Sequence, residues 1–207
     1  MAADEQQMLR LQAGDRKAFN GLVEKYRRPL VGFLYRMVHD AATAEELAQE
    51  VFLRVYRALA RYRPSAKFST WLFTIAANLA LNSLRDGRLR RAVELPPDFS
   101  AAPAAGRGVS ASADVRGESF AADVADPRPT HEQEMIAAER LRAIREAVSE
   151  LPEKQRLAVV LHKYEELDYA EIAEILGCSE SALKSLLFRA YETLRMKLRP
   201  FISQREL

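Results

Sequence analysis

The sequence predicts an all-α protein, built as two small helical domains that are joined by a long flexible linker. Apolar residues recur at spacings of three and four in both halves of the 207 residues, and no stretch shows the alternation of a β-strand. A Pro- and Ala-rich stretch without helical periodicity separates the two halves. We therefore expect domains at residues 1–91 and 134–207, with the linker at 92–133.

Three amphipathic helices are predicted in the first half. Their apolar stripes lie within residues 19–30, 44–59 and 71–80, and each stripe defines one buried face. Turn signals separate them, at Gly14-Asp15, His39-Asp40 and Arg63-Pro64-Ser65. Asp40 is the expected N-cap of the second helix, and Ser69 or Thr70 that of the third.

The composition changes abruptly after residue 91. Residues 92–129 contain five Pro, three Gly and ten Ala, with few large apolar side chains. A structureless stretch of this length is unusual inside one compact domain. It therefore favours two domains over one.

Helical periodicity returns within residues 136–151 and 157–164 and leads to the most informative stretch of the chain. Asp168 and Glu171 have the spacing of a capping box, and Gly177 is suited to end the short helix that follows. Ser179 begins a longer, basic helix almost at once. A short helix, a turn with Gly and a longer helix form the helix-turn-helix pattern, which we favour over a general αα-hairpin.

A helical wheel divides the second of these helices into two faces. We expect four residues to be buried: Leu183, Leu187, Ala190 and Leu194. The opposite face, with Lys184 on its flank, is suited to enter a major groove, and it carries Ser181, Ser185, Phe188, Arg189 and Glu192. Lys184 and Arg189 can bind phosphates or guanine edges, and Phe188 can cover a thymine methyl. The alternative is that Phe188 belongs to a larger core.

Charge is unevenly distributed along the chain. Residues 1–91 carry a net charge of +7 and residues 181–207 a net charge of +4, whereas residues 92–129 and 130–180 carry −3 and −6. Two basic zones suggest two contacts with a polyanion, although ordinary solvated helix faces would give the same pattern.

The first half contains a second nucleic-acid signal. Between residues 62 and 85, aromatic side chains alternate with amides and basic groups, which suits unpaired bases that stack on rings. The candidates are Tyr62, Lys67, Phe68, Ser69, Thr70, Trp71, Asn78, Asn82 and Arg85. The alternative for Trp71 and Phe73 is that they fill the core. We favour that alternative for Trp71 but not for the loop 62–70.

Three of these stretches together resemble bacterial sigma factors of the extracytoplasmic-function (ECF) group. They are Ala44-Glu-Glu-Leu-Ala-Gln-Glu-Val-Phe52, then Phe68-Ser-Thr-Trp71, then residues 168–177 with Lys184-Ser-Leu-Leu-Phe-Arg189. The resemblance covers residues 8–91 and 134–200. It implies two helical domains that join core RNA polymerase and direct it to a promoter.

The resemblance also implies roles for each site. The helix 44–59 would bind the polymerase through Glu45, Glu46, Gln49 and Glu50, residues 62–85 would open and bind the minus-ten element, and the helix 179–194 would bind the minus-thirty-five element. The acidic linker would lie near the active-site and RNA-exit channels of polymerase. Leu186 stands where the family often has a basic residue, so one phosphate contact is expected to be missing.

Other classes of function find little support. The chain has one cysteine, Cys178, and three scattered histidines, so we expect no disulfide, no metal, no cofactor and no enzymatic activity. A redox role for Cys178 stays a minor alternative. No stretch is apolar enough to span a bilayer and no secretory signal is evident, so we expect a cytoplasmic protein.

The remaining alternative is a conventional repressor or activator with an N-terminal sensor or dimerisation domain. Such a domain has no use for the aromatic and amide side chains of residues 62–85, whereas strand opening does. The resemblance further implies promoter DNA, core RNA polymerase and an anti-sigma factor as partners.

Overall fold

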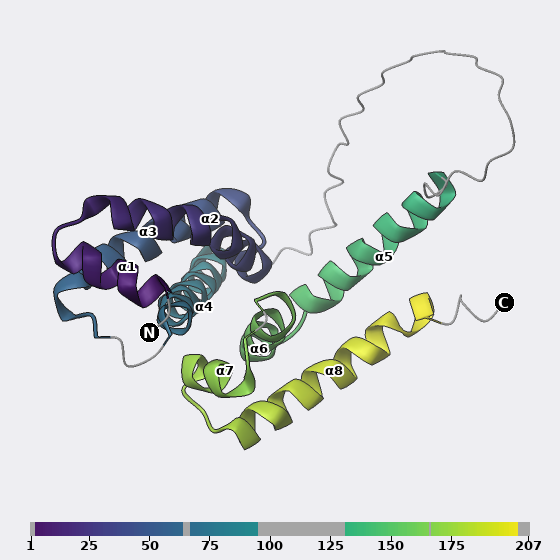
Figure 1. The fold of residues 1–207 in the computed structure, drawn as a ribbon. Coiled ribbons are helices and arrows are strands. Elements are labelled where there is room, and N and C mark those ends of the chain that lie inside the picture. Colours follow the sequence, from purple (N-terminus) through teal and green to yellow (C-terminus); the bar gives the residue numbers. More distant parts are fainter. Residues whose placement is uncertain (1–2, 64–66, 95–130, 166, 203–207) are drawn as a thin grey trace, which may run out of the picture.

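The chain folds into two groups of α-helices that pack against each other (Figure 1). The computed structural model describes residues 3–63, 67–94, 131–165 and 167–202, and within them every regular element is helical. The first group contains α1 (Ala3–Gln12), α2 (Arg16–Val38), α3 (Ala41–Arg57), the 3₁₀ turn η1 (Leu59–Arg61) and α4 (Phe68–Glu94). The second contains α5 (His131–Ser149), α6 (Glu153–Tyr164), α7 (Tyr169–Leu176) and α8 (Glu180–Ile202). The all-α, two-domain prediction is confirmed.

The linker prediction falls mostly outside the described residues. Helix α4 extends to Glu94 and α5 begins at His131. Most of the predicted linker, residues 95–130, therefore lies outside the described residues.

Local capping explains several helix boundaries. The Asp40 carboxylate accepts a hydrogen bond of 2.7 Å from the Thr43 N–H, which confirms Asp40 as the N-cap of α3. Asp168 and Glu171 form the predicted capping box at the start of α7. Gly177 ends α7 with a φ of +62°, the left-handed conformation that glycine adopts without steric strain.

The start of α4 differs from the prediction. Helix α4 begins at Phe68, so Ser69 and Thr70 lie inside its first turn and are not its N-cap. The Phe68 N–H instead donates a hydrogen bond of 2.9 Å to the carboxylate of Glu5, which comes from α1. No helix is predicted from the sequence over the residues of α1. Its buried side chains Met8 and Leu11 pack it against the first group.

The core runs without interruption through both groups. In the first group α2 packs on α1, α3 and α4, and its fully buried side chains include Leu22, Leu30 and Phe33. In the second group α6 is central, with Leu157 and Leu161 buried against α7 and α8. The two groups meet where α2 contacts α6 and where α4 contacts α7.

Candidate nucleic-acid and polymerase interfaces

Helix α8 presents one exposed face and one buried face, as the helical wheel predicts. Leu183, Leu187 and Ala190 are buried against α6 and α7, and so is Leu194. The candidate DNA-binding residues all lie on the exposed side: Ser181, Lys184, Ser185, Phe188 and Arg189. The Phe188 side chain is 67% exposed, so the alternative that it belongs to the core is wrong.

The exposed face of α8 carries donors that are free to contact a ligand. The Arg189 guanidinium makes only a local hydrogen bond, from Nε to the Ser185 carbonyl at 3.2 Å. Lys184 lies with its ammonium 5.9 Å from the centre of the Tyr169 ring. Leu186 is half-buried and packs against the core, so its side chain belongs to the packed side of the helix. Cys178, a free thiol, is half-buried in the turn before α8.

The candidate minus-ten residues divide into an exposed and a buried set. Asn78, Asn82 and Arg85 are exposed on one face of α4, because spacings of three and four place them on successive turns. Arg85 donates a hydrogen bond of 3.1 Å to the Asn82 side-chain oxygen. We call these three residues the α4 polar face. Trp71 is half-buried about two turns earlier.

Tyr62 and Phe68 do not form the exposed stacking surface that the sequence predicts. Phe68 is only 1% exposed, with its ring 5.3 Å from the Tyr26 ring, and Tyr62 is buried with its ring 5.1 Å from the Trp71 ring. The physical reason is tertiary packing, because the Phe68 ring lies against Tyr26 of α2 and α1 contacts the 3₁₀ turn η1 just before Tyr62. Phe73 is buried, as the core alternative expects, and its ring lies 5.3 Å from the Phe33 ring.

Lys67 directly precedes α4, and Ser69 and Thr70 lie in its first turn. Lys67 is exposed, Ser69 is half-buried and Thr70 is buried. Lys67 and Thr70 both contact Glu171, a residue of α7 in the other group of helices.

An apolar groove lies beside the candidate polymerase-binding residues of α3. The side chains of Glu45, Glu46 and Gln49 are exposed, whereas Glu50 is half-buried and accepts a 2.7 Å hydrogen bond from Arg54. That contact lowers the pKa of the Glu50 carboxyl, mainly through the hydrogen bond from Arg54. The groove, about 470 Å³ in volume, runs between α2 and α3 and is lined by Phe19, Val23, Arg27, Glu45, Ala48, Gln49, Phe52, Leu53 and Tyr56.

The aromatic side chains of this groove are residues that the sequence places only in the core. The rings of Phe19 and Tyr56 lie 5.6 Å apart, and those of Phe19 and Phe52 lie 6.3 Å apart. Leu53 and Tyr56 are nearly half exposed. The signal that could have found them is the width of the stripe, because one helix face cannot bury Phe52, Leu53 and Tyr56 together.

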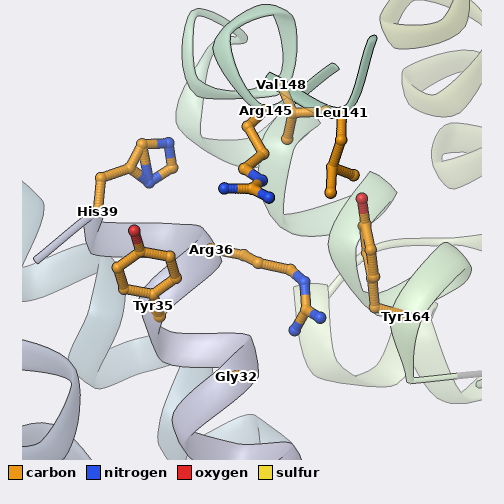
Figure 2. Close-up of a pocket in the computed structure, with 8 residues that line it drawn as sticks. All are labelled: Gly32, Tyr35, Arg36, His39, Leu141, Arg145, Val148 and Tyr164. Atoms are coloured by element: carbon orange, nitrogen blue, oxygen red, sulfur yellow. The ribbon is translucent and has the colours of Figure 1, made fainter. Parts of the chain in front are cut away.

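A second cavity, of about 400 Å³, lies where the two groups of helices meet (Figure 2). Tyr35, Arg36 and His39 reach it from the C-terminal end of α2. Leu141 and Arg145 of α5 and Tyr164 of α6 line the other side. The Arg36 guanidinium lies 4.1 Å from the centre of the Tyr164 ring, a cation–π contact between the two groups.

Neither cavity holds a catalytic or metal-binding cluster. Across residues 3–63, 67–94, 131–165 and 167–202, no group of three His, Cys, Asp or Glu side chains could hold a metal ion. Over the same residues, no helix is both long enough and apolar enough to cross a bilayer. The described residues thus include exposed polar faces on α4 and α8 and an apolar groove between α2 and α3.

The helix-turn-helix of α7 and α8 is typical of DNA-binding proteins, and comparison with known proteins identifies the family. The family model for Sigma-70 region 2 matches residues 22–90, and that for Sigma-70 region 4 matches residues 141–194. The chain is 34% identical over 201 residues to the RNA polymerase sigma-H factor of Pseudomonas aeruginosa, a match that spans 97% of this chain and 96% of the relative. It is 33% identical over 195 residues to the ECF RNA polymerase sigma-E factor of Escherichia coli, at 93% of both chains.

Solved structures show the same fold. CnrH, in complex with the cytosolic domain of CnrY, matches with a TM-score of 0.65 and 20% identity over 96% of this chain and 99% of that one. The sigma factor RpoE of Bartonella quintana, in complex with the anti-sigma factor NepR, matches with a TM-score of 0.60 and 22% identity over 88% of this chain and 98% of that one.

The chain belongs to the ECF group of bacterial RNA polymerase sigma factors. It is therefore a transcription initiation factor, which binds core RNA polymerase and directs it to specific promoters.

Proposed function

We propose that the two groups of helices divide the work of this sigma factor. Residues 1–91 would bind core RNA polymerase and the minus-ten element, and residues 134–207 would bind the minus-thirty-five element. The observation that carries this proposal is the two-sided character of α8. Its leucines are buried, while Lys184, Ser185 and Arg189 lie exposed and able to enter a major groove.

Polymerase docking is proposed for the α2–α3 groove, which Glu45 and Gln49 line, and for their neighbours Glu46 and Glu50 on α3. We call these four the rim residues. Aromatic side chains in a concave site, with polar groups around them, are the usual composition of a protein-binding hot spot. A charged rim mainly controls the association rate and the choice of partner. Leu53 and Tyr56 would then contribute more affinity than the four rim residues.

The docking proposal is tested by the double variant Gln49→Ala with Glu50→Ala. Neither side chain is buried, so we expect a loss of stability within about 0.5 kcal/mol for each and a weaker binding of core polymerase. Glu146→Ala on α5, which is also exposed, is the control. If the double variant melts like the parent and competes fully for core polymerase, the polymerase-binding surface does not include Gln49 and Glu50.

Minus-ten binding is proposed for the α4 polar face, with Lys67 and Trp71 at the N-terminal end of the helix. Amide side chains can hydrogen-bond the edges of unpaired bases, and Arg85 can pair with a phosphate. Tyr62 and Phe68, being buried, would hold this surface in place from beneath. Ser69 and Thr70 lie in the first turn of α4, close to that surface.

The chain would act without catalytic activity of its own and in the cytoplasm, where RNA polymerase lies. An anti-sigma factor is the further partner that we propose. The support comes from two relatives in fold, because CnrH is bound to the cytosolic domain of CnrY and RpoE to the anti-sigma factor NepR.

A gel-shift experiment with promoter duplex tests the proposed mode of DNA binding. A sigma factor should bind its duplex poorly alone and well together with core polymerase. Equally strong binding of the duplex by the chain alone would contradict this mode of DNA binding.

A further inference from the structure

Glu171 joins the two groups of helices at the start of α4. One oxygen of its carboxylate, Oε1, accepts a hydrogen bond of 3.0 Å from the Thr70 hydroxyl and lies 3.1 Å from the Lys67 ammonium. The other oxygen, Oε2, accepts a 3.1 Å hydrogen bond from the Asp168 N–H and so completes the capping box. A single carboxylate therefore caps α7 and contacts two residues of the other group.

The contact is sheltered from solvent on the Glu171 side. The Glu171 side chain is 12% exposed, and Thr70 is only 1% exposed, whereas the Lys67 side chain remains 64% exposed. The hydrogen bond to Glu171, together with its negative charge, raises the pKa of the Lys67 ammonium. Lys67 is thus fully charged at neutral pH and turned toward a carboxylate of the other group.

An ammonium and a hydroxyl directed at one anionic oxygen are also the donors that bind a DNA phosphate. Both donors stand at the N-terminal end of a 27-residue helix, where the helix dipole favours negative charge. Lys67 and Thr70 belong to the residues proposed for the minus-ten element. In this arrangement the carboxylate of Glu171 occupies the place that a phosphate oxygen would take.

We infer that Glu171 is an internal competitor of promoter DNA, an autoinhibitory contact between α7 and the start of α4. The inference rests on the proposed role of residues 62–85. While the two groups of helices are packed together, the Lys67–Thr70 site is satisfied by Glu171. When α7 moves away, as it does if the two domains separate on polymerase, the same two donors become free for a phosphate.

The substitution Glu171→Gln isolates the charge from the rest of the contact. A glutamine at this position still serves a capping box, because its side-chain oxygen accepts a hydrogen bond from the N-cap residue. With that oxygen on the Asp168 N–H, the amide NH₂ of the glutamine takes the place of Oε1 and can donate a hydrogen bond to the Thr70 hydroxyl oxygen. The negative charge that attracts the Lys67 ammonium is lost. Glu174→Gln is the matched control, because Glu174 is an exposed carboxylate on the same short helix.

The assay uses the full chain and a fluorescein-labelled (dT)₂₀ single strand, with fluorescence anisotropy as the readout. An ion pair of this partly exposed kind corresponds to a change of about two- to fivefold in an equilibrium constant. We expect Glu171→Gln to bind the strand about two- to fivefold more tightly than the parent, and Glu174→Gln to bind like the parent. The gain should shrink as salt is raised from about 50 to 300 mM, since screening weakens the internal pair.

Adding Lys67→Gln separates the competition from the proposed DNA site. If the gain of Glu171→Gln disappears in the double variant, the strand uses Lys67 and the inference holds. If Lys67→Gln weakens binding but Glu171→Gln binds like Glu174→Gln, the DNA site stands and the competition is wrong. If Lys67→Gln has no effect in either background, Lys67 is not a DNA contact, and both the competition and the proposed role of Lys67 at the minus-ten element are wrong. Equal circular-dichroism melting curves would show that every variant is folded.

Discussion

Arg156 is a buried charge that links the two groups of helices. It is only 8% exposed, in the first turn of α6. Its Nη1 donates a hydrogen bond of 2.7 Å to the carbonyl of Met37, near the C-terminal end of α2. Its Nη2 donates to the carbonyls of Ser149 and Leu151, which connect α5 to α6. One guanidinium thus satisfies carbonyls on both sides of the domain boundary.

The change Arg156→Met keeps most of the buried stem and removes every donor. A hydrogen bond from a charged group contributes about 1.5–3 kcal/mol, and a buried carbonyl left without a donor loses about 1–3 kcal/mol. The Leu151 contact is long, at 3.4 Å, so the contacts to Met37 and Ser149 carry most of the effect. Part of this loss is offset, because the variant no longer has to remove a guanidinium from water when it folds. We expect a net loss of about 3 kcal/mol in the free energy of unfolding.

Thermal melting followed by circular dichroism measures this loss. For a chain of this size, about 3 kcal/mol corresponds to a fall of about 6–12 °C in the Tm. The two groups should also melt in separate transitions once their contact is weakened. Lys154→Met, at an exposed position of the same helix, should leave the Tm almost unchanged. A Tm for Arg156→Met within about 2 °C of the parent would refute the argument.

Three further predictions follow from single residues. Phe68→Ala removes a fully buried ring and leaves a cavity, so it should lower the free energy of unfolding by about 3–5 kcal/mol in urea titrations. A change under about 1 kcal/mol would contradict the burial of Phe68. A Cβ added at Gly177 meets no atom within 4 Å, so Gly177→Ala should lower the free energy of unfolding by about 1 kcal/mol only through the φ of +62°. Gly177→Asn should lower it less in the same urea assay, because Asn adopts the left-handed conformation more readily. Burial raises the pKa of the Glu165 carboxyl to about 7 against the opposing attraction of Arg36, from 4.5 in an unfolded chain. The folded chain then binds more protons than the unfolded chain between about pH 4.5 and 7, so stability contributed by this group falls as the pH rises through that window. Melting curves at pH 5 and pH 8 should show that Glu165→Gln loses less stability between these pH values than the parent does. An equal loss in the parent and the variant would contradict the raised pKa of Glu165.

Local chemistry explains what the sequence predicts correctly. The N-cap Asp40, the capping box of Asp168 with Glu171 and the left-handed Gly177 each depend on neighbours within four residues. The two faces of α8 follow from helical periodicity, because its leucines and its polar side chains point in opposite directions. Periodicity therefore predicts which side chains of α8 are exposed, including Phe188.

Contacts between distant residues explain what the sequence does not predict. Phe68 is buried with its ring against Tyr26 of α2, and Glu5 of α1 accepts from the Phe68 N–H in place of a cap by Ser69 or Thr70. Arg156 and Glu171 contact partners that lie 119 and 101 positions away. No periodicity or capping rule describes a pair at such a separation, so the packing of the two groups of helices requires the three-dimensional structure.

Permanganate footprinting of unpaired thymines is the measurement that tests the division of labour most directly. The chain is combined with core RNA polymerase on a promoter fragment that the complex itself selects from genomic DNA. A second template carries a pre-melted mismatch bubble over the minus-ten element. Asn78→Ala and Arg189→Ala suit this test, because both side chains are exposed and neither change should disturb the core.

The proposed roles predict opposite patterns for the two variants. Asn78→Ala should form closed complexes like the parent but open the intact duplex about fivefold less, as the loss of one hydrogen bond of about 1 kcal/mol implies, and the bubble should restore part of the signal. Arg189→Ala should reduce complex formation on both templates, because a base contact worth about 1–3 kcal/mol is lost before opening begins. If Asn78→Ala opens the intact duplex as well as the parent does, α4 does not open the minus-ten element and the central assignment is wrong.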